Sequence, residues 1–583
     1  MEFEQILARP MFAGMKGAAG LAVGLWVLLL PVAMGSTLAM RVHAYALSPH
    51  LPHPVTGALV LVLLPSLLFF AVGRAVGRRR ERRSGTGSAA GTRTGSRRGA
   101  HGSAAWSAGR DLVRPEGLVL GRQLRGRTRR RPGPLLRYDG PGHVLTVAPT
   151  RSGKGVGAVV PNLLAHPGAL VATDPKGENY AVTARHRRQA GHDVQALDPF
   201  DVVGGAAAFN PLDALDPAGL DAADDAALIA EMLVVPREGA SGDSAFWDTE
   251  AKALLAGLVL HVAAEERGDK RSLPRVRELL TLPPERFTAL LKTMEASKKA
   301  HGLVARAAAR LRQKADKERS GVVSAAQSHT HFLDSPRMRR VLSRSTFDLA
   351  ALKRPPGRFH VGGDGALASG GEAGGLLSLY LVLPPDRLDT YRGWLRLVIA
   401  SSLLAVARTP GQPRHRALFL LDEFANLGPM PPVLRAYSLL AGYGAQLWVF
   451  LQDLSQLQGT YPRKWGSFLA NADVLQAFGT NDHETAVLLS KMLGEATVRS
   501  ANAGQNSGTN TPFGLPSFSR GRSTGHTETG RPLLTPDEVR RLPPDEQVLF
   551  VRGAAPVLAR RVRYYEDAAF RGLHDPNPTL APA

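Results

Sequence analysis

The residues with the clearest chemical potential lie between Ala148 and Gly157, where the chain reads APTRSGKGVG. An apolar run over 143–147 precedes them and an apolar helical segment follows, which is the strand–turn–helix order of a phosphate-binding loop. In such a loop, backbone N–H groups bind phosphate oxygens, glycine permits their close approach and lysine adds positive charge. The predicted nucleotide-binding residues are Ala148, Pro149, Thr150, Arg151, Ser152, Gly153, Lys154, Gly155 and Val156.

This loop departs from the usual pattern G-x-x-x-x-G-K-[ST] at two positions. Ala148 stands in place of the first glycine, and Gly155 stands in place of the hydroxyl residue that would bind Mg²⁺. Taken alone, the segment also fits a plain strand–turn–helix with an exposed lysine. A second half of the site is needed to decide between these interpretations.

That second half is predicted at Asp422 and Glu423, which follow the apolar stretch 417–421. An apolar stretch that ends in two carboxylates predicts a buried parallel strand whose C-terminal end meets the ligand. Asp422 would hold Mg²⁺ through a water, and Glu423 would polarise the attacking water. Gln452 ends the next apolar stretch and would sense the γ-phosphate or orient water, with a capping amide as the alternative. The predicted catalytic residues are Lys154, Glu423 and Gln452.

A third polar segment, DPKGEN over 174–179, follows the apolar residues 169–173. Ligands of α/β folds bind at the C-terminal ends of the strands, so this segment is predicted to lie at the edge of the site. The residues concerned are Asp174, Lys176 and Glu178. An ordinary β-turn with proline at its second position is the alternative.

The N-terminal region predicts a membrane hairpin over 1–83. Residues 17–40 and 55–73 are uncharged and apolar, and a membrane-spanning helix needs about 20 such residues. Six arginines between 74 and 83 follow the second span, whereas the loop between the spans carries only Arg41. The excess of positive charge on one side places both termini in the cytoplasm of a protein of the inner (cytoplasmic) membrane. The alternative, a cleaved signal peptide, conflicts with the length of the first run and with the second span.

The residues that follow, 84–137, are rich in Arg, Gly and Ser and predict a flexible juxtamembrane linker. The range 74–137 holds 18 arginines and no lysine against three acidic residues, and therefore carries +15 of the total net charge of +22. Contact with anionic membrane lipid explains this charge, which is then weak support for DNA binding. The chain contains no cysteine, so disulfide scaffolds, thiolate metal sites and cysteine nucleophiles are excluded.

Several separated motifs occur in one order: APTRSGKGVG, DPKGEN (174–179), NPLD (210–213), LLDEFANLG (420–428), QDLSQL (452–457) and FGTNDHETA (478–486). In this order they resemble the TraG-like (VirD-type) coupling proteins of type IV secretion and conjugative DNA transfer. The closing segments RPLLTPDEVRRLP (531–543) and VRYYED (562–567) fit the same family.

The resemblance implies an α/β fold, with two N-terminal transmembrane helices followed by a RecA-like P-loop NTPase domain. That domain would cover 138–243 and 346–570. An inserted all-α domain would cover 244–345, in which helical spacing of apolar residues is also visible. Residues 500–530, rich in Ser, Gly, Asn and Thr, predict a flexible loop, and 571–583 predict a flexible tail.

The resemblance also implies a function, a coupling ATPase that uses ATP and Mg²⁺. Its partners would be a relaxase–DNA complex or secreted protein substrates, and the components of a type IV secretion channel. Members of the family form homo-hexamers, in which a neighbouring subunit donates an arginine to the γ-phosphate; Arg396 and Arg435 are the candidates here.

Two other functions are compatible with a membrane protein that has a phosphate loop. One is an FtsK-like DNA translocase, against which the two-span hairpin and the LLDEFANLG and QDLSQL segments argue. The other is a receptor that binds nucleotide and substrate without hydrolysis, which the missing hydroxyl at Gly155 favours and the presence of Glu423 opposes.

Overall fold

The protein divides into two compact units, residues 1–96 and 97–583. The computed structural model describes residues 101–125, 131–235, 243–353, 359–361, 367–369, 375–510 and 517–579, all of which belong to the second unit. The two membrane spans predicted over 17–40 and 55–73 therefore lie outside the described residues. Among the helices that are described, none combines the length and apolar character needed to cross a bilayer.

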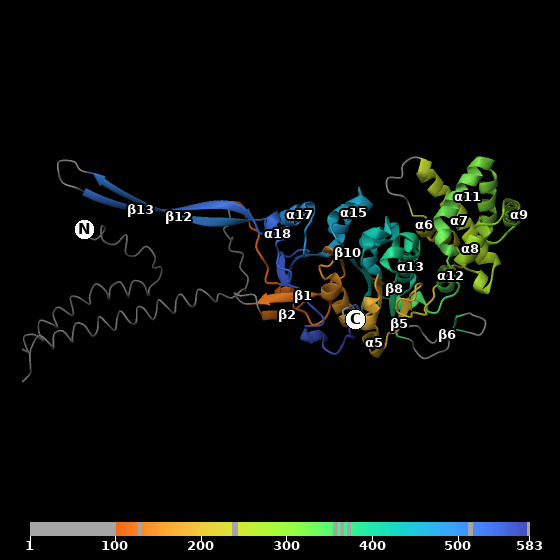
Figure 1. Ribbon diagram of the computed structural model, residues 1–583, viewed down its shortest axis with the longest axis horizontal. Coiled ribbons are helices and arrows are strands. Elements are labelled where there is room, and N and C mark those ends of the chain that lie inside the picture. Colours follow the sequence, from red (N-terminus) through yellow and green to blue (C-terminus); the bar gives the residue numbers. More distant parts are fainter. Residues whose placement is uncertain are drawn as a thin grey trace, which may run out of the picture. The chain divides into compact units, whose positions relative to one another are not determined.

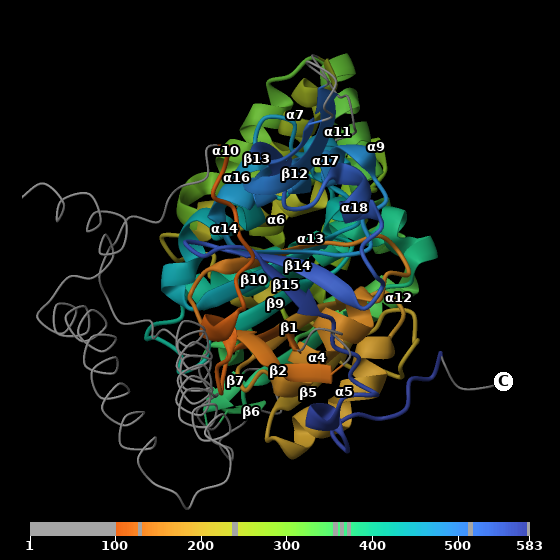
Figure 2. The ribbon, with the colours of Figure 1, turned by 90° about the vertical axis from the view of Figure 1, so that its left-hand side faces the viewer.

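Among the described residues, eleven strands form one mixed sheet in the order β2-β1-β15-β14-β11-β3-β10-β9-β4-β8-β5 (Figures 1 and 2). The strands from β11 to β5 are parallel, whereas β14, β15, β1 and β2 extend the sheet as antiparallel strands. The strands of this sheet are β1 (Leu118–Arg125), β2 (Arg131–Tyr138), β3 (His143–Val147), β4 (Leu170–Asp174), β5 (Asp193–Leu197), β8 (Leu377–Val382), β9 (Ala417–Leu421), β10 (Ala445–Leu451), β11 (Ala472–Ala477), β14 (Glu546–Val551) and β15 (Val557–Arg560).

The central strands β3, β10, β9, β4 and β8 are mostly apolar and are buried at every position, because both faces of the sheet are covered. In β9, Phe419 and Leu421 pack into a core with the long helix α13 (Leu388–Arg408), whereas Leu418 and Leu420 pack into a second core on the other face. The second core includes Leu163 of α4 (Val160–Ala165). Alternate side chains of a strand point to opposite faces, which explains the two cores.

A largely helical region lies between β5 and β8. Its longest helix is α7, and α8, α10 and α11 all contact α7 in the bundle seen at one end of Figure 1. Helix α6, which precedes residue 244, packs against both α7 and α13. The helices are α6 (Ala222–Leu233), α7 (Asp243–Glu265), α8 (Leu273–Leu280), α9 (Pro284–Glu295), α10 (Leu303–Arg312), α11 (Asp316–Thr330) and α12 (Pro336–Leu342).

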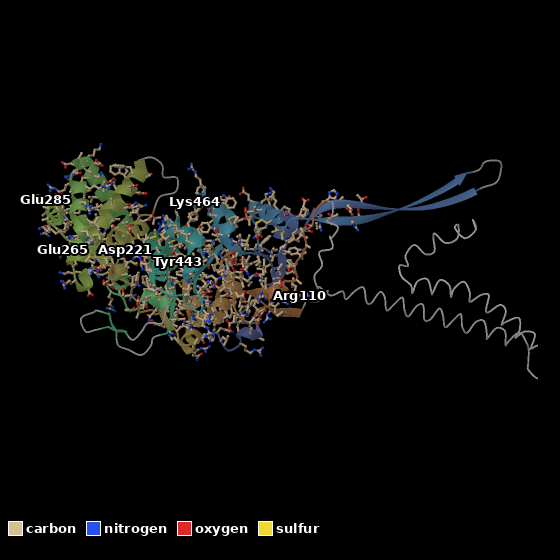
Figure 3. All side chains as sticks on the ribbon, turned by 180° about the vertical axis from the view of Figure 1, so that it is seen from behind. Arg110, Asp221, Glu265, Glu285, Tyr443 and Lys464 are labelled. Atoms are coloured by element: carbon tan, nitrogen blue, oxygen red, sulfur yellow. The ribbon has the colours of Figure 1, made fainter. Side chains whose placement is uncertain are left out.

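Many basic side chains of this helical region are paired within it. Lys299 lies 2.6 Å from Glu265, and Arg310 lies 2.6 Å from Glu250. Glu265 and Glu285 are labelled on the surface of the bundle in Figure 3. These two basic residues therefore have acidic partners on α7.

Two predictions of flexibility are wrong. The linker predicted over 84–137 overlaps β1 and β2, which form an antiparallel pair within the main sheet. The loop predicted over 500–530 is instead mostly a two-stranded antiparallel ribbon of β12 (Glu495–Asn510) and β13 (Ser517–Pro532), paired from Glu495↔Pro532 to Asn510↔Ser517 (Figure 1). Low aliphatic content hid the β12–β13 ribbon, because backbone pairing between two strands needs no apolar core along its length.

Several further elements are described. A short pair of strands, β6 (Phe359–Val361) and β7 (Leu367–Ser369), lies before β8 in the sequence. The other helices are α5 (Glu178–Gln189), α14 (Pro431–Leu439), α15 (Leu454–Thr460), α16 (Trp465–Asn471), α17 (His483–Leu493) and α18 (Pro536–Arg540).

Candidate nucleotide-binding site

The phosphate loop connects β3 to a short π-helical turn (Gly155–Val159) that continues into α4. Gly153 has a φ of 83°, a left-handed conformation that favours glycine. The guanidinium of Arg561 donates a hydrogen bond to the Gly153 carbonyl oxygen at 3.1 Å and lies over the ring of Phe478. Burial lowers the pKa of Arg561 to about 10, which leaves it cationic beneath the loop.

Lys154 turns toward the two acidic residues that were predicted to complete the site. Its Nζ lies 3.2 Å from Oε1 of Glu423 and 3.6 Å from Oδ1 of Asp422. Only 7% of the lysine side chain is exposed, so these carboxylates are its principal charge partners in the structure. The loop and the end of β9, which are far apart in the sequence, therefore meet at one site.

The sheet order explains why they meet. Strand β10 lies between β3 and β9 and is parallel to both, so all three strands end at the same edge. Gln452, directly after β10, donates a hydrogen bond from Nε2 to Oε2 of Glu423 at 2.8 Å. The structure thus brings the three predicted catalytic residues together, with Gln452 holding the carboxylate of Glu423.

Glu423 adopts a backbone conformation that is unusual for a residue with a side chain. Its φ is 52° and its ψ is 36°, in the left-handed region. Such conformations cost free energy of order 1 kcal/mol and persist where surrounding contacts determine them. Here Glu423 N donates to Oδ1 of Asp422 at 3.0 Å, and Asn426 donates to Oε2 of Glu423 at 3.4 Å. The strained turn directs the carboxylate toward Lys154.

Asp422 is held in place through Thr173 of β4. The Asp422 backbone N–H donates to Thr173 Oγ1 at 2.7 Å, and Thr173 Oγ1 donates to the Asp422 carbonyl at 3.1 Å. Burial raises the pKa of Asp422, and the nearby Lys154 opposes that shift. The carboxylate keeps 21% of its surface exposed, toward the cavity.

These residues fit a magnesium ion that is bound mainly through phosphate and water. Mg²⁺ is usually held by one or two carboxylates plus substrate phosphates. Asp422 supplies one carboxylate, and the described residues contain no cluster of three or more His, Asp or Glu side chains that could hold a metal by themselves. A Cβ at Gly155 would meet no atom within 4 Å, so there is open space where the side chain of the missing hydroxyl residue would begin.

The predicted edge residues differ in their surroundings. Asp174 is 2% exposed and accepts a hydrogen bond from Tyr180 N at 2.8 Å; burial raises its pKa to about 6. Lys176 is 67% exposed and lies 3.7 Å from Glu178. Glu178, at the start of α5, accepts a hydrogen bond from Thr579 at 2.7 Å. All three residues line the cavity, Asp174 as a buried side chain and Lys176 and Glu178 as more exposed ones.

The two candidate arginines occupy contrasting positions. Arg396 is 1% exposed and donates hydrogen bonds to the carbonyl oxygens of Met232, Leu427 and Pro429. Its guanidinium is bound to carbonyl oxygens of its own chain and is too buried to reach a neighbouring copy. Arg435 is exposed on α14. Of these two residues, only Arg435 is therefore accessible to the nucleotide site of another copy.

Most of the predicted phosphate-loop residues, the three predicted catalytic residues and Asp422 surround one cavity of about 660 Å³. Its lining includes Thr150, Arg151 and the segment 153–156 from the phosphate loop, together with Asp422, Glu423 and Gln452. Sequence reasoning assigned no role to Asn426, Tyr564 and Asn577, which also line it. Asn426 and Tyr564 lie within the motifs LLDEFANLG and VRYYED, which indicated the family but predicted no role for these two residues. Asn577 lies in the segment predicted to be a flexible tail; that prediction is wrong for residues up to Thr579.

Comparisons with known proteins agree with this geometry. The family model described as type IV secretory system conjugative DNA transfer matches residues 108–362 and 374–581. The conjugal transfer protein TraG of Escherichia coli is 31% identical over 467 residues, which cover 75% of this chain and 69% of TraG. VirD4 of Rhizobium rhizogenes is 29% identical over 452 residues, which cover 74% of this chain and 60% of VirD4.

Solved structures show the same fold. The plasmid coupling protein TrwB in complex with the ATP analogue ADPNP superposes with a TM-score of 0.56 at 17% identity, covering 82% of this chain and 96% of TrwB. TrwB with ADP and Mg²⁺ gives a TM-score of 0.55 at 16% identity, covering 82% of this chain and 97% of that one. The family model covers most of the chain and the motifs converge on one site, so this protein belongs to the type IV secretory system conjugative DNA transfer family.

Proposed function

We propose that this protein is a membrane-anchored coupling ATPase that delivers a relaxase–DNA complex or a protein substrate to a type IV secretion channel. The observation that carries the proposal is the convergence of Lys154, Asp422, Glu423 and Gln452 around one cavity in a chain of the conjugative DNA transfer family. The similarity to TraG and VirD4 supports conjugative transfer over an FtsK-like chromosome translocase.

ATP and Mg²⁺ are the proposed ligands of the cavity. Backbone N–H groups of the loop and Lys154 would hold the phosphates, while Asp422 would hold Mg²⁺ through water. Bound Mg²⁺ supplies charge neutralisation at the phosphate oxygens. Glu423 would accept a proton from the attacking water, and Gln452, already bonded to its other oxygen, would keep that carboxylate oriented.

A homo-hexamer is the proposed assembly, in which a neighbouring copy completes the nucleotide site. Among the described residues that line the cavity, Arg151 of the phosphate loop is the only arginine. Arg435, exposed on α14, is the proposed donor from a neighbouring copy. Two N-terminal spans, both termini in the cytoplasm and contact of the arginine-rich segment with anionic lipid are proposed for the anchoring in the inner membrane.

A mating assay tests the function. Cells whose own copy is deleted would be complemented with the wild-type chain, Lys154→Ala, Glu423→Gln or Lys464→Ala; Lys464 is exposed and serves as the matched control (Figure 3). We expect transfer to fall to the level of the deletion strain for the first two variants and to stay normal for the control. Normal transfer by Lys154→Ala would exclude an ATP-driven role.

A receptor that binds nucleotide without turnover is the remaining alternative, and the glycine at position 155 favours it. The two functions differ in one measurement, the release of phosphate by the purified full-length chain with DNA and Mg²⁺. Phosphate release that is abolished in Glu423→Gln supports the ATPase. Nucleotide binding with no release in the wild type supports the receptor.

A further inference from the structure

The cavity has a wall that comes from the last residues of the chain. Tyr564 and Asn577 line the same cavity as Gly153, Lys154 and Asp422. Neither residue belongs to the phosphate-binding or catalytic motifs. Their presence raises the question of which part of a ligand this wall contacts.

Polar contacts with α5 fix the wall in place. Asp575 Oδ1 lies 2.6 Å from Nε of Arg185, and Asp575 N donates to the Val182 carbonyl at 2.9 Å. Thr579 Oγ1 donates to Oε1 of Glu178 at 2.7 Å. Three anchors along one helix hold the segment from Asp575 to Thr579 against the ATPase core, so it forms a built surface of the cavity.

The chemistry of this wall combines an apolar part with a polar edge. Val156 and Val160, which follow Lys154 in the sequence, pack in one cluster with Val182 of α5. Tyr564 belongs to the same cluster and is 3% exposed. Next to them, Asn577 Nδ2 lies 3.4 Å from Oε2 of Glu178. Burial raises the pKa of Tyr564, while a hydrogen bond with Asn577 opposes that shift.

An inorganic phosphate chain would gain no favourable contacts from an apolar surface with a carboxylate at its edge. Apolar side chains beside an amide and a carboxylate suit a flat heterocycle with a polar rim and a sugar that carries hydroxyl donors. The asparagine amide can both donate to and accept from a base edge, and the carboxylate of Glu178 can accept from ribose hydroxyls. Val156 belongs to both the phosphate loop and this cluster, so one ligand can reach from the loop to the wall.

We propose that Tyr564, Asn577 and Glu178 bind the nucleoside part of the nucleotide whose phosphates lie on the loop at 153–156. The inference rests on the proposed nucleotide-binding function and adds the residues that distinguish a nucleoside triphosphate from a bare polyphosphate. The inference also gives the segment from Asp575 to Thr579 a role in the ligand site, which this segment shapes through its contacts with α5.

Binding measurements on the purified full-length chain test the proposal. Isothermal titration calorimetry in Mg²⁺ buffer would give the Kd of ATP and, separately, of inorganic tripolyphosphate. In Asn577→Ala we expect the Kd of ATP to rise about tenfold, the effect of losing one buried hydrogen bond, while the Kd of tripolyphosphate stays unchanged. Tyr564→Ala is expected to act in the same direction, and Tyr564→Phe, which keeps the ring, to have a smaller effect.

The matched control is Arg571→Ala, a neighbouring exposed position that does not line the cavity. It should keep the wild-type Kd for both ligands. Equal weakening of ATP and tripolyphosphate in Asn577→Ala, or no change in either, would overturn the nucleoside assignment and leave the proposed ATPase intact. Wild-type protein that binds neither ligand would instead overturn the nucleotide site itself.

Discussion

The ammonium of Lys154 lies 3.2 Å from Oε1 of Glu423, and the other carboxylate oxygen of Glu423 accepts a hydrogen bond from Gln452 at 2.8 Å. In this arrangement the lysine that would bind phosphate neutralises the carboxylate that would accept a proton from water. A bound triphosphate would give Lys154 a more highly charged partner and would free one oxygen of Glu423. Under the proposed function, this ion pair would couple nucleotide binding to activation of the base.

This coupling predicts that Glu423→Gln separates binding from turnover. Without the carboxylate, hydrolysis should fall by about 10²- to 10⁴-fold, because the general base is lost. The Kd of ATP should be unchanged or lower, because Lys154 no longer has to leave an ion pair. Steady-state phosphate release and calorimetry measure the two effects, with the exposed Glu484→Gln as the control. A parallel loss of affinity and rate would contradict the proposed role.

The open space at Gly155 predicts that a hydroxyl can be introduced there. In Gly155→Ser, the new Cβ would meet no atom within 4 Å, and the hydroxyl would add a ligand for Mg²⁺. We expect the Mg²⁺ concentration that gives half-maximal hydrolysis to fall by up to about tenfold, or ~1.4 kcal/mol. An Mg²⁺ dependence identical to that of the wild type would show that the hydroxyl does not reach the ion.

Gly153, in the same loop, leaves little room for a side chain, so Gly153→Ala should be harmful. Its Cβ would lie 2.7 Å from the Arg561 guanidinium, and the φ of 83° is unfavourable for alanine. The strain should cost ~1 kcal/mol or more and weaken binding of tripolyphosphate as well as ATP. Tripolyphosphate binding of wild-type strength would contradict this account of the loop.

The buried carboxyl of Asp174 predicts a pH-dependent stability. Its pKa in the folded chain is about 6, against an ordinary value of 3.8, because burial disfavours the charged form. The folded chain therefore holds this proton more tightly than the unfolded chain. The stability that follows is fully present below about pH 4 and is lost as the pH rises through about 6.

In Asp174→Asn this loss should disappear. The decrease in unfolding free energy between about pH 4 and pH 7 should be smaller than in the wild type by up to ~3 kcal/mol. Thermal unfolding without nucleotide, recorded at both pH values, measures the difference. The exposed Asp269→Asn serves as the control. An unchanged pH dependence in Asp174→Asn would show that another group causes it.

The contrast between Arg396 and Arg435 predicts two different phenotypes. Arg396→Ala removes a buried cation that satisfies three carbonyl oxygens, so it should lower the free energy of unfolding by ~3 kcal/mol. Arg435→Ala should leave the melting temperature unchanged and lower hydrolysis by the assembled protein by about 10³-fold or more. Thermal melts and phosphate release measure the two effects.

Mixing two inactive chains tests whether Arg435 acts on a neighbour. Assemblies of Arg435→Ala with Glu423→Gln contain some interfaces in which an intact Arg435 faces an intact Glu423. We expect such mixtures to regain part of the activity that each variant lacks alone. No recovery would remove Arg435 from the proposed site.

The sequence by itself determined the parts of the site that depend on short segments. The phosphate loop, the carboxylates after an apolar strand and Gln452 after another are local patterns, because strand, turn and loop conformations follow from neighbouring residues. Their order along the chain was enough to indicate the family. It also led to errors where polar composition was taken as flexibility, as in β12 and β13 and in the segment that holds Asn577.

Only the tertiary structure decided which of these residues meet. Strand β10 lies between β3 and β9, and this order places Lys154, Glu423 and Gln452 at one edge although they are far apart in the sequence. The tertiary structure buries Arg396 and leaves Arg435 exposed, although composition cannot distinguish the two arginines. It also brought Tyr564 and Asn577 to the cavity through contacts with α5. Strand order and helix packing arise from contacts between distant segments, which no local pattern specifies.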